Sequence, residues 1–559
     1  MSSLNCTLNR FEEEFAGRHL IHGVVRHWAK EEPDSLAFIN ADRKQEVDWA
    51  TFDRITDLVA MQLVGLGFRW GDFFATSLPF LTEHLYLEYA CFKIGVIHAP
   101  LDLRLKPAEV IRCLNLIGAK GYAFPGTARG IDFGELGRAA KAHCPTIRTL
   151  VQLTDPAETI EGAVSFAELA AAAPPDELQA AFNKVTAAVD ENDGAQVIFT
   201  TGSTGTPKGA LLSHRNITCQ NMCLGAAFGF GENTRLLVNL PPSHVGGQAE
   251  ALMTTLFWGG TAVLLEVFDA LRSVEAIQTH RVNILGQIPA MYQFEWRLSD
   301  YGKYDLSSLE FVIYGGQQVP MQFLERLAVM SPKIGTGLGL TEAAGFCTYT
   351  HLDASPAEII ESIGHEMPVY PMSIRQLMRD DGSAGDELPD GEMGQICFRG
   401  PQTFLGYVND PAATARAISA NGHLYTGDMG FRDGKGLHFA GRSKWVIKPG
   451  GYQVFPAEVE NHLCTHSKIA ACGVVGMEHA VFTEAIVAFV EKKSGADLTA
   501  KEIKEHARAM TSYMRPRHYV ILEPGQMPLN RGVKTDYLRL QEMAREEIER
   551  LRAARRWDR

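Results

Sequence analysis

The strongest constraint on the fold is a regular alternation of short apolar runs with amphipathic stretches along most of the chain. Stretches with helical periodicity, such as Ile55–Leu66 and Val274–His280, lie between runs that are typical of buried strands. These runs are Phe74–Ser77, Val197–Thr200, Ala262–Glu266, Val282–Leu285 and Phe311–Tyr314. Strands that alternate with helices indicate an α/β fold with largely parallel sheets.

The length predicts several packed units rather than one globule. At about 150 residues per domain, 559 residues correspond to roughly four units. Turn-forming residues cluster at 380–391, and the strands expected after them, Ile396–Arg399 and Leu437–Ala440, indicate a strand-rich subdomain. From Lys444 onward the pattern is that of a compact α+β unit ending in a charged, solvated helix at 537–559. Residues 167–176 are expected to form a surface connector.

Charge and cysteine content exclude several classes of protein. The net charge of −13 disfavours a broad nucleic-acid surface, which requires a basic face. The ten cysteines show no pairing at zinc spacing and suit a reducing compartment, and Cys219 and Cys223 are expected on one face of a helix. The N-terminal segment lacks the apolar core of a signal peptide, and no apolar run is long enough to span a membrane. A cytoplasmic protein is therefore expected.

A glycine-rich segment, TTGSTGTPKG at 200–209, directly follows the strand-like QVIFT. Glycines at 202, 205 and 209 let the backbone approach a ligand closely, and the hydroxyls and N–H groups can donate to phosphate oxygens. Lys208 supplies a mobile positive charge. The spacing is not that of a Walker A loop, which disfavours P-loop kinases and GTPases. The alternative, a flexible linker, does not require Pro-Lys-Gly after a buried strand.

Further motifs follow this loop in a fixed order. They are GLGLTE at 337–342, HLYTGD at 423–428, GRSKWVIKPGGYQVFPAEVE at 441–460 and MPLNRGVK at 527–534. Together with 65–74 and 92–105, they resemble the adenylate-forming (AMP-binding) superfamily, in its acyl/aryl-CoA synthetase branch. The resemblance covers nearly the whole chain. It implies a large N-terminal domain at 1–442, made of two α/β subdomains and a small β-rich one. A small, mobile α+β C-terminal domain would occupy 443–559.

The resemblance also implies an ATP site and a magnesium site. The implied ATP-binding residues are Thr200, Thr201, Gly202, Ser203, Thr204, Gly205, Lys208, Gly316, Gln317, Leu338, Asp428 and Arg442. Within this set the glycine-rich loop would hold the β- and γ-phosphates, and Asp428 would accept from the ribose hydroxyls. Thr341 would donate to the α-phosphate, and Glu342 would bind Mg²⁺. Outside the motif context, an acid at a helix start is the favoured interpretation of Glu342, and the alternative for Asp428 is an ordinary turn aspartate.

Three further roles follow from the same resemblance. Lys534 would place its ammonium on the attacking carboxylate, and His244 would line the acyl site or the thiol channel. A hinge at Lys444 would let the C-terminal domain rotate between half-reactions. The implied CoA-binding residues are Lys448, Gly450 and Gly451. The alternatives are a surface role for the lysine, a structural histidine and two glycines needed only for a tight turn.

Four positions depart from the family pattern. Leu338 stands where an aromatic residue usually stacks on adenine, and Val533 replaces the glycine before the catalytic lysine. Trp445 replaces an acid after the hinge, and Gln395 replaces a glutamate. None of these positions is expected to touch phosphate or metal, so activity is expected to survive.

The residues after His244 bear on the choice of acid. No acidic residue follows before Glu250, whereas members that activate amino acids carry an aspartate there to pair the substrate ammonium. An uncharged medium-chain, alicyclic or aromatic tail is therefore favoured. Three functions remain open: a carboxylate–CoA ligase, an enzyme that loads a carrier protein, and a non-catalytic nucleotide-binding relative. The expected partners are a small carboxylic acid, ATP and CoA, and the sequence leaves a homodimer open.

Overall fold

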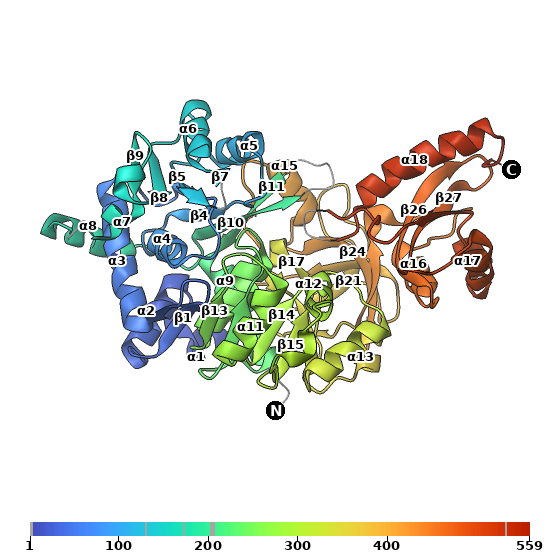
Figure 1. Ribbon diagram of the computed structural model, residues 1–559, viewed down its shortest axis with the longest axis horizontal. Helices are drawn as coiled ribbons and strands as arrows, with labels where there is room; N and C mark the ends of the chain where they lie inside the picture. Colours follow the sequence, from blue (N-terminus) through green and yellow to red (C-terminus); the bar gives the residue numbers. More distant parts are fainter. Residues whose placement is uncertain (1–3, 129–130, 172–173, 202–206, 531–533, 559) are drawn as a thin grey trace.

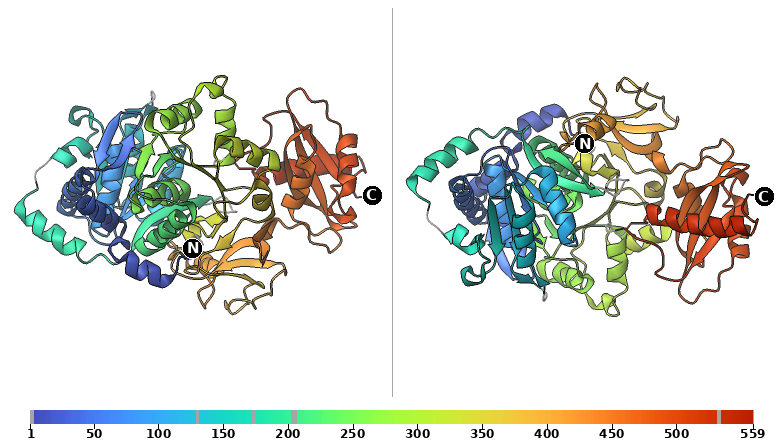
Figure 2. Two further views of the ribbon diagram at one scale, coloured as in Figure 1. Left: turned by 90° about the horizontal axis from the view of Figure 1, so that it is seen from below. Right: turned by 90° about the horizontal axis from the view of Figure 1, so that it is seen from above.

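A computed structural model describes residues 4–128, 131–171, 174–201, 207–530 and 534–558. A large N-terminal body holds two extended sheets and a smaller one, and a separate α+β domain lies at one end of the molecule (Figure 1). Two further views show this C-terminal domain standing apart from the body (Figure 2). The mixed α/β class and the division into a large and a small domain confirm the architecture expected from the sequence.

The first extended sheet has seven strands in the order β16-β15-β14-β12-β13-β1-β2. Their bounds are β1 Leu36–Asn40, β2 Gln45–Asp48, β12 Arg235–Val238, β13 Thr261–Leu264, β14 Ile284–Gln287, β15 Phe311–Tyr314 and β16 Ile334–Gly335. Every pair is parallel except β1–β2. Helices α11 (Ala270–His280), α12 (Pro289–Trp296) and α13 (Met321–Met330) connect the strands. Parallel strands buried on both faces read as continuous apolar runs, which explains the pattern in the sequence.

The second extended sheet has eight strands in the order β23-β11-β10-β4-β3-β5-β8-β9. Their bounds are β3 Phe73–Thr76, β4 Ile97–Pro100, β5 Gly121–Pro125, β8 Thr149–Leu153, β9 Ala163–Ser165, β10 Gly194–Thr201, β11 Pro207–Ser213 and β23 Gly406–Tyr407. Strands β10, β11 and β23 are antiparallel neighbours. Three helices connect the parallel strands: α4 (Thr82–Lys93), α5 (Pro107–Ile117) and α6 (Gly134–His143). Pro107 begins α5 and Gly118, with φ +63°, ends it, as the local sequence favours.

Among the described residues, a four-stranded sheet, a three-stranded sheet and three two-stranded sheets complete the fold. The four-stranded sheet consists of β21 (Met372–Arg375), β22 (Gly394–Phe398), β24 (Leu424–Asp433) and β25 (Gly436–Arg442). The C-terminal domain has β26 (Ile469–His479), β27 (Thr483–Lys492) and β28 (His518–Leu522), with helices α16 (Pro456–Cys464), α17 (Ala500–His506) and α18 (Tyr537–Ala553). The predicted strand-rich subdomain and the compact α+β unit are both present.

Two local predictions need correction. The expected connector at 167–176 is largely helical, because α7 (Phe166–Ala171) buries Phe166 and Leu169, and α8 (Asp176–Thr186) begins at its end. The terminal helix α18 ends at Ala553 rather than at residue 559; its charged side chains are mostly exposed, as expected, while Leu540 and Ile548 are buried on the opposite face. Cys219 and Cys223 do share helix α9 (His214–Phe228), where both are buried.

Helix composition bears on membrane insertion. Within the described residues, no helix is both long enough and apolar enough to cross a bilayer.

Candidate active site

Three loops at the carboxyl edge of the seven-stranded sheet carry predicted site residues. His244 follows β12, Gly316 and Gln317 follow β15, and Leu338–Glu342 follows β16. Ligands of open α/β sheets bind at this edge, because the loops after parallel strands converge there. Leu338 is almost fully buried, whereas Gly316 and Gln317 are exposed. At this edge, exposed Gly316 and Gln317 therefore lie on the surface, and the apolar side chain of Leu338 is buried.

The two described ends of the glycine-rich segment lie in the β10–β11 hairpin. Thr200 faces Lys208 across this hairpin, and Thr201 ends β10. The Lys208 ammonium lies 5.0 Å from the centre of the Tyr407 ring, and the Tyr407 hydroxyl donates to Glu342 Oε1 at 2.6 Å. The hairpin thus meets the GLGLTE segment through Tyr407. The predicted ligands Gly202, Ser203, Thr204 and Gly205 lie outside the described residues, as does Val533.

Glu342 has the chemistry that a magnesium site needs. Its carboxylate is half-buried and held through Oε1 by Tyr407, and hard oxygen donors of this kind suit Mg²⁺. Magnesium is commonly bound by one or two protein carboxylates together with substrate phosphates. Neighbouring Thr341 begins the same short 3₁₀ turn, Thr341–Ala343, and is half-buried. The donor set therefore fits a phosphate-bound magnesium ion.

Asp428 and Arg442 form a pair across β24 and β25. The two residues are register partners, and Arg442 Nε lies 2.9 Å from Asp428 Oδ1. Burial raises the pKa of Asp428, while the Arg442 guanidinium and the Lys534 ammonium oppose that rise. An acceptor-only carboxylate beside exposed guanidinium nitrogens can bind a diol and an adjacent anion.

Lys534 reaches from the C-terminal domain to the loop after β15. A Cβ atom added at Gly316 would lie 3.0 Å from Lys534 Cε and 3.2 Å from Nζ, so the two residues are in contact. The main chain of Lys534 is fixed by two hydrogen bonds with Asn530, at 2.8 and 3.1 Å. Burial and the Arg442 charge lower the pKa of Lys534. The two domains therefore meet with this ammonium at the carboxyl edge of the sheet.

The His244 side chain reaches the protein surface, but many protein atoms lie close around its ring. The Gly246 N–H donates to His244 Nδ1 at 3.0 Å, so the ring proton lies on Nε2. Burial, aided by the Lys534 ammonium, lowers the pKa of His244 to about 4. A neutral ring with a free Nε2–H can donate a hydrogen bond to a carboxylate without adding charge.

Glu250 is a site residue that the sequence pattern missed. It lies in η3, a π-helical segment at Gly246–Met253, and π-helical turns are frequent at functional sites. A Cβ at Gly246 would lie 3.1 Å from His244 Nδ1 and 3.3 Å from Glu250 Oε2, so both side chains flank the same glycine. The turns of η3 bring Glu250 back beside the glycine that His244 also flanks, which its place in the linear sequence does not reveal.

The predicted hinge and CoA-binding residues lie together in the C-terminal domain. Lys444 is exposed, and its ammonium lies 4.8 Å from the centre of the Trp445 ring. Gly450 and Gly451 have φ of +60° and +89°, and the Gly450 N–H donates to the carbonyl of Phe482 at 2.8 Å. Exposed Lys448 donates its N–H to Glu484. The positive φ values mean that a tight turn already requires both glycines, whatever else they do.

Replacing Gly337 with alanine is expected to disrupt the GLGLTE segment. Its Cβ would lie 1.8 Å from the carbonyl oxygen of Thr348, which is backbone and cannot swing away. We expect a loss of about 3 kcal/mol in the free energy of unfolding, measured by urea denaturation. Gly434→Ala is the matched control, since a Cβ there meets nothing within 4 Å. Equal stability of both variants would contradict the close packing of Gly337.

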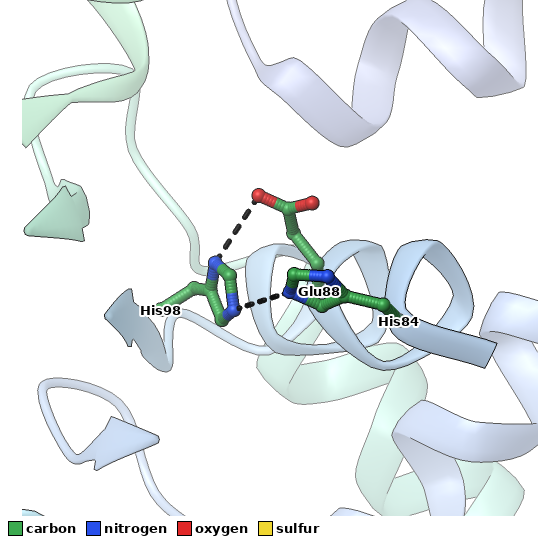
Figure 3. Close-up of side chains that lie close together, drawn as sticks. All are labelled: His84, Glu88 and His98. Carbon is green, nitrogen blue, oxygen red and sulfur yellow. Dashed lines mark hydrogen bonds and ion pairs between the residues drawn. The ribbon is translucent and has the colours of Figure 1, made fainter. Parts of the chain in front are cut away.

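A buried polar network supports the strand that leads to the glycine-rich loop. Figure 3 shows His84 and Glu88 on α4 facing His98 on β4. His84 Nδ1 donates to the Pro79 carbonyl at 2.9 Å, so its Nε2 accepts from the Thr76 hydroxyl at 3.1 Å. That hydroxyl in turn accepts from His98 Nε2 at 3.0 Å, and His98 Nδ1 lies 3.1 Å from Glu88 Oε1. Thr76 therefore links the two histidine rings, and Glu88 lies against the second of them.

This network is joined to β10 by a side-chain hydrogen bond. Gln196, the register partner of His98, donates to Glu88 Oε1 at 2.8 Å. Burial lowers the pKa of His84 to about 4, and it lowers the pKa of His214, at the start of α9, to about 4 as well. Both rings are therefore kept neutral in the folded protein.

These buried histidines predict a loss of stability in mild acid. An unfolded histidine titrates near 6.5, so between about pH 6.5 and 4 the unfolded chain binds more protons than the folded one. Stability is fully present above about pH 6.5 and falls below it, by at most on the order of 3 kcal/mol for each ring. Urea midpoints measured from pH 7.0 to 4.5 should fall less steeply for His84→Gln than for the wild type. His143→Gln, at an exposed position, should keep the wild-type slope; a wild-type slope in His84→Gln would refute the assignment.

Comparison with known proteins gives a consistent result. Residues 25–408 match the family model described as AMP-binding enzyme, and residues 458–534 match the AMP-binding enzyme C-terminal domain. Feruloyl-CoA synthase of Amycolatopsis sp is 30% identical over 475 residues, which cover 84% of this chain and 88% of that protein. The mitochondrial medium-chain acyl-CoA ligase of Macaca fascicularis is 24% identical over 558 residues, covering 96% and 88%.

A solved structure shares the fold. ATP-bound MatB from Rhodopseudomonas palustris superposes with a TM-score of 0.79 at 21% identity, covering 94% of this chain and 99% of that one.

Proposed function

The chain belongs to the AMP-binding enzyme family and is an AMP-forming acid–CoA ligase, and from this premise we propose the course of its reaction and its substrate class. In the first half-reaction a carboxylate oxygen attacks the α-phosphate of ATP, the bond to the β-phosphate breaks, and pyrophosphate leaves. In the second, the CoA sulfur attacks the acyl carbon, AMP leaves with the bonding electron pair, and the thiol proton passes to solvent. The acid has an uncharged medium-chain, alicyclic or aromatic tail.

One observation carries the proposal: Lys534 contacts Gly316 and lies within electrostatic range of Asp428 and Arg442. The first half-reaction brings two anions together, so it needs cations at the point where they meet. The half-buried ammonium is such a cation, and its depressed pKa reflects burial among charges rather than a surface position. In this assignment Lys534 orients the carboxylate and stabilises the charge that develops on the bridging oxygen.

The remaining residues hold the nucleotide. Lys208 and the loop around it bind the β- and γ-phosphates, and Thr341 donates to the α-phosphate. Glu342 holds Mg²⁺, which offsets phosphate charge when bound. Asp428 accepts from the ribose hydroxyls, and Arg442 lies on the ribose and phosphate side. The adenine rests on backbone after β15, at Gly316 and Gln317, and on the aliphatic side chain of Leu338, in place of an aromatic ring.

The second half-reaction uses the C-terminal domain again. Rotation about Lys444, at a boundary between residues 442 and 443, removes Lys534 and presents the turn with Lys448, Gly450 and Gly451. The glycine turn leaves a narrow passage for the pantetheine arm, while Nε2–H of His244 faces the acyl carbonyl of the adenylate.

The test measures pyrophosphate release with ATP–Mg²⁺ across a panel of hexanoate, octanoate, cyclohexanecarboxylate, benzoate and 4-hydroxycinnamate, with and without CoA. We expect acid-dependent release in both conditions and a CoA thioester only when CoA is present. The panel contains both aromatic and medium-chain acids because one relative is named a feruloyl-CoA synthase and the other a medium-chain acyl-CoA ligase. If acids support pyrophosphate release but CoA never yields a thioester, the acceptor is instead a carrier protein, and the ligase assignment fails.

A further inference from the structure

Glu250 lies over the hairpin formed by β17 (Gly339–Leu340) and β18 (Gly345–Phe346), directly behind the GLGLTE segment. A Cβ at Gly345 would lie 2.7 Å from Glu250 Oε1, and one at Gly339 would lie 3.3 Å from the same oxygen. Two glycines thus make the room that this carboxyl group occupies. The Phe346 N–H donates to it, yet the side chain remains only half-buried. The carboxyl group therefore lies beside both glycines of this hairpin, in a side chain that keeps partial exposure.

The surroundings of Glu250 favour its protonated, neutral form. Burial raises the pKa of Glu250 to about 7, and the Lys534 ammonium works against this rise. Near neutral pH the group can therefore donate as well as accept a hydrogen bond. Glu250 and His244, the residue assigned to the acyl site, flank the same Gly246, so the carboxyl group lies near the position assigned to the substrate carboxylate.

A second polar group at the same place lacks a partner. Gln220, on α9, is fully buried, and its Nε2 has no hydrogen-bond acceptor among the residues that the structure describes. This nitrogen would lie 3.0 Å from a Cβ at Gly345, the glycine that Glu250 also flanks. Its Oε1 already accepts from Asn221. An unpaired buried amide is costly, so a ligand atom that accepts from it is favoured.

We propose that Glu250 and Gln220 form a polar subsite that selects carboxylic acids bearing a hydroxyl or carbonyl oxygen near the carboxylate. The proposal rests on the ligase function and specifies its substrate class. A hydroxyl oxygen can accept from Gln220 and donate to Glu250, and a carbonyl oxygen can accept from both. An ammonium substituent has no lone pair for the Gln220 amide, and the nearby Lys534 charge repels it. The tail is thus uncharged but not wholly apolar.

The test compares matched pairs of acids: benzoate with 2-hydroxybenzoate, and hexanoate with 3-hydroxy- and 3-oxohexanoate. For the wild type we expect kcat/KM for at least one oxygenated acid to exceed that of its parent by about tenfold or more, because the parent leaves buried polar groups unpaired. In Glu250→Met and in Gln220→Leu this ratio should fall by about tenfold or more. Glu250→Gln, which keeps a donor and an acceptor, should retain most of it.

Ratios separate a selective role from a merely structural one, since a folding defect lowers both members of a pair equally. Glu392→Met, at an exposed position away from the site, is the control and should keep the wild-type ratio. Parent acids that match or exceed every oxygenated partner in the wild type would overturn the subsite, as would unchanged ratios in both variants. Absence of pyrophosphate release with every acid would instead overturn the ligase function itself.

Discussion

Lys534→Ala is expected to lower acid-dependent pyrophosphate release by about 10²–10³-fold, while thioester formation from supplied acyl-adenylate and CoA continues. The lysine contacts Gly316 at the carboxyl edge of the sheet, where we propose that the carboxylate and the α-phosphate meet. Without its charge, the repulsion between the two anions is no longer offset and the carboxylate loses its orientation. The second half-reaction begins from a neutral acyl carbon and needs no such cation. The measurement is kcat/KM of each half-reaction assayed separately.

Lys501→Ala is the matched control for this prediction. Lys501 is an exposed lysine of the same C-terminal domain, and its loss should leave both half-reactions at wild-type rates. A Lys534→Ala variant that loses both half-reactions equally would contradict the role assigned to the lysine. Such a result would indicate that Lys534 holds the two domains together rather than acting on the acid.

Glu342→Gln is expected to lower the rate of adenylation by about 10²-fold and to raise the Mg²⁺ concentration needed for half-maximal activity. The change preserves shape and the hydrogen bond from Tyr407 but removes the charge that suits a hard cation. Magnesium titrations of pyrophosphate release at saturating ATP measure both effects.

Tyr407→Phe tests the same site through its supporting residue. The Tyr407 hydroxyl holds Glu342 Oε1 at 2.6 Å, and loss of such an orienting partner typically costs 10–100-fold in metal affinity or activity. We expect a shift in Mg²⁺ dependence in the same direction as for Glu342→Gln but smaller. If Glu342→Gln lowers the rate with an unchanged Mg²⁺ requirement, the carboxylate does not hold the metal.

The parts of the fold that could be predicted are those whose cause is local. The run Phe311–Tyr314 coincides with β15, because a strand buried on both faces must be apolar throughout. The strand predicted at Val282–Leu285 begins and ends two residues before the observed strand β14, Ile284–Gln287. The reason is that polar Gln287 interrupts the apolar pattern at the end of the strand. Strand β23 has only two residues and forms by pairing with the edge of β11. No local sequence pattern predicts it.

In the candidate site, too, the residues of contiguous motifs could be predicted, whereas residues brought in by tertiary packing could not. Motifs such as GLGLTE are contiguous, and the sequence therefore predicts that their residues lie together. Tyr407 orients Glu342 from 65 positions away, and Glu250 returns to the site only through the turn of η3. The network of His84, Glu88 and His98 joins a helix to a strand across a sheet. Apart from His84 and Glu88, which share one face of α4, these residues carry no spacing that a linear pattern could reveal, because tertiary packing brings them together.

The central claim is that one site activates an acid as its adenylate and then passes it to CoA. The most direct measurement mixes the enzyme with ATP–Mg²⁺ and an acid from the panel, first without CoA, and identifies the products by mass spectrometry. The account predicts pyrophosphate and an enzyme-bound acyl-adenylate, followed by a CoA thioester and AMP once CoA is added. Formation of ADP and phosphate, or of a thioester from an enzyme that never accumulates or turns over the adenylate, would contradict it.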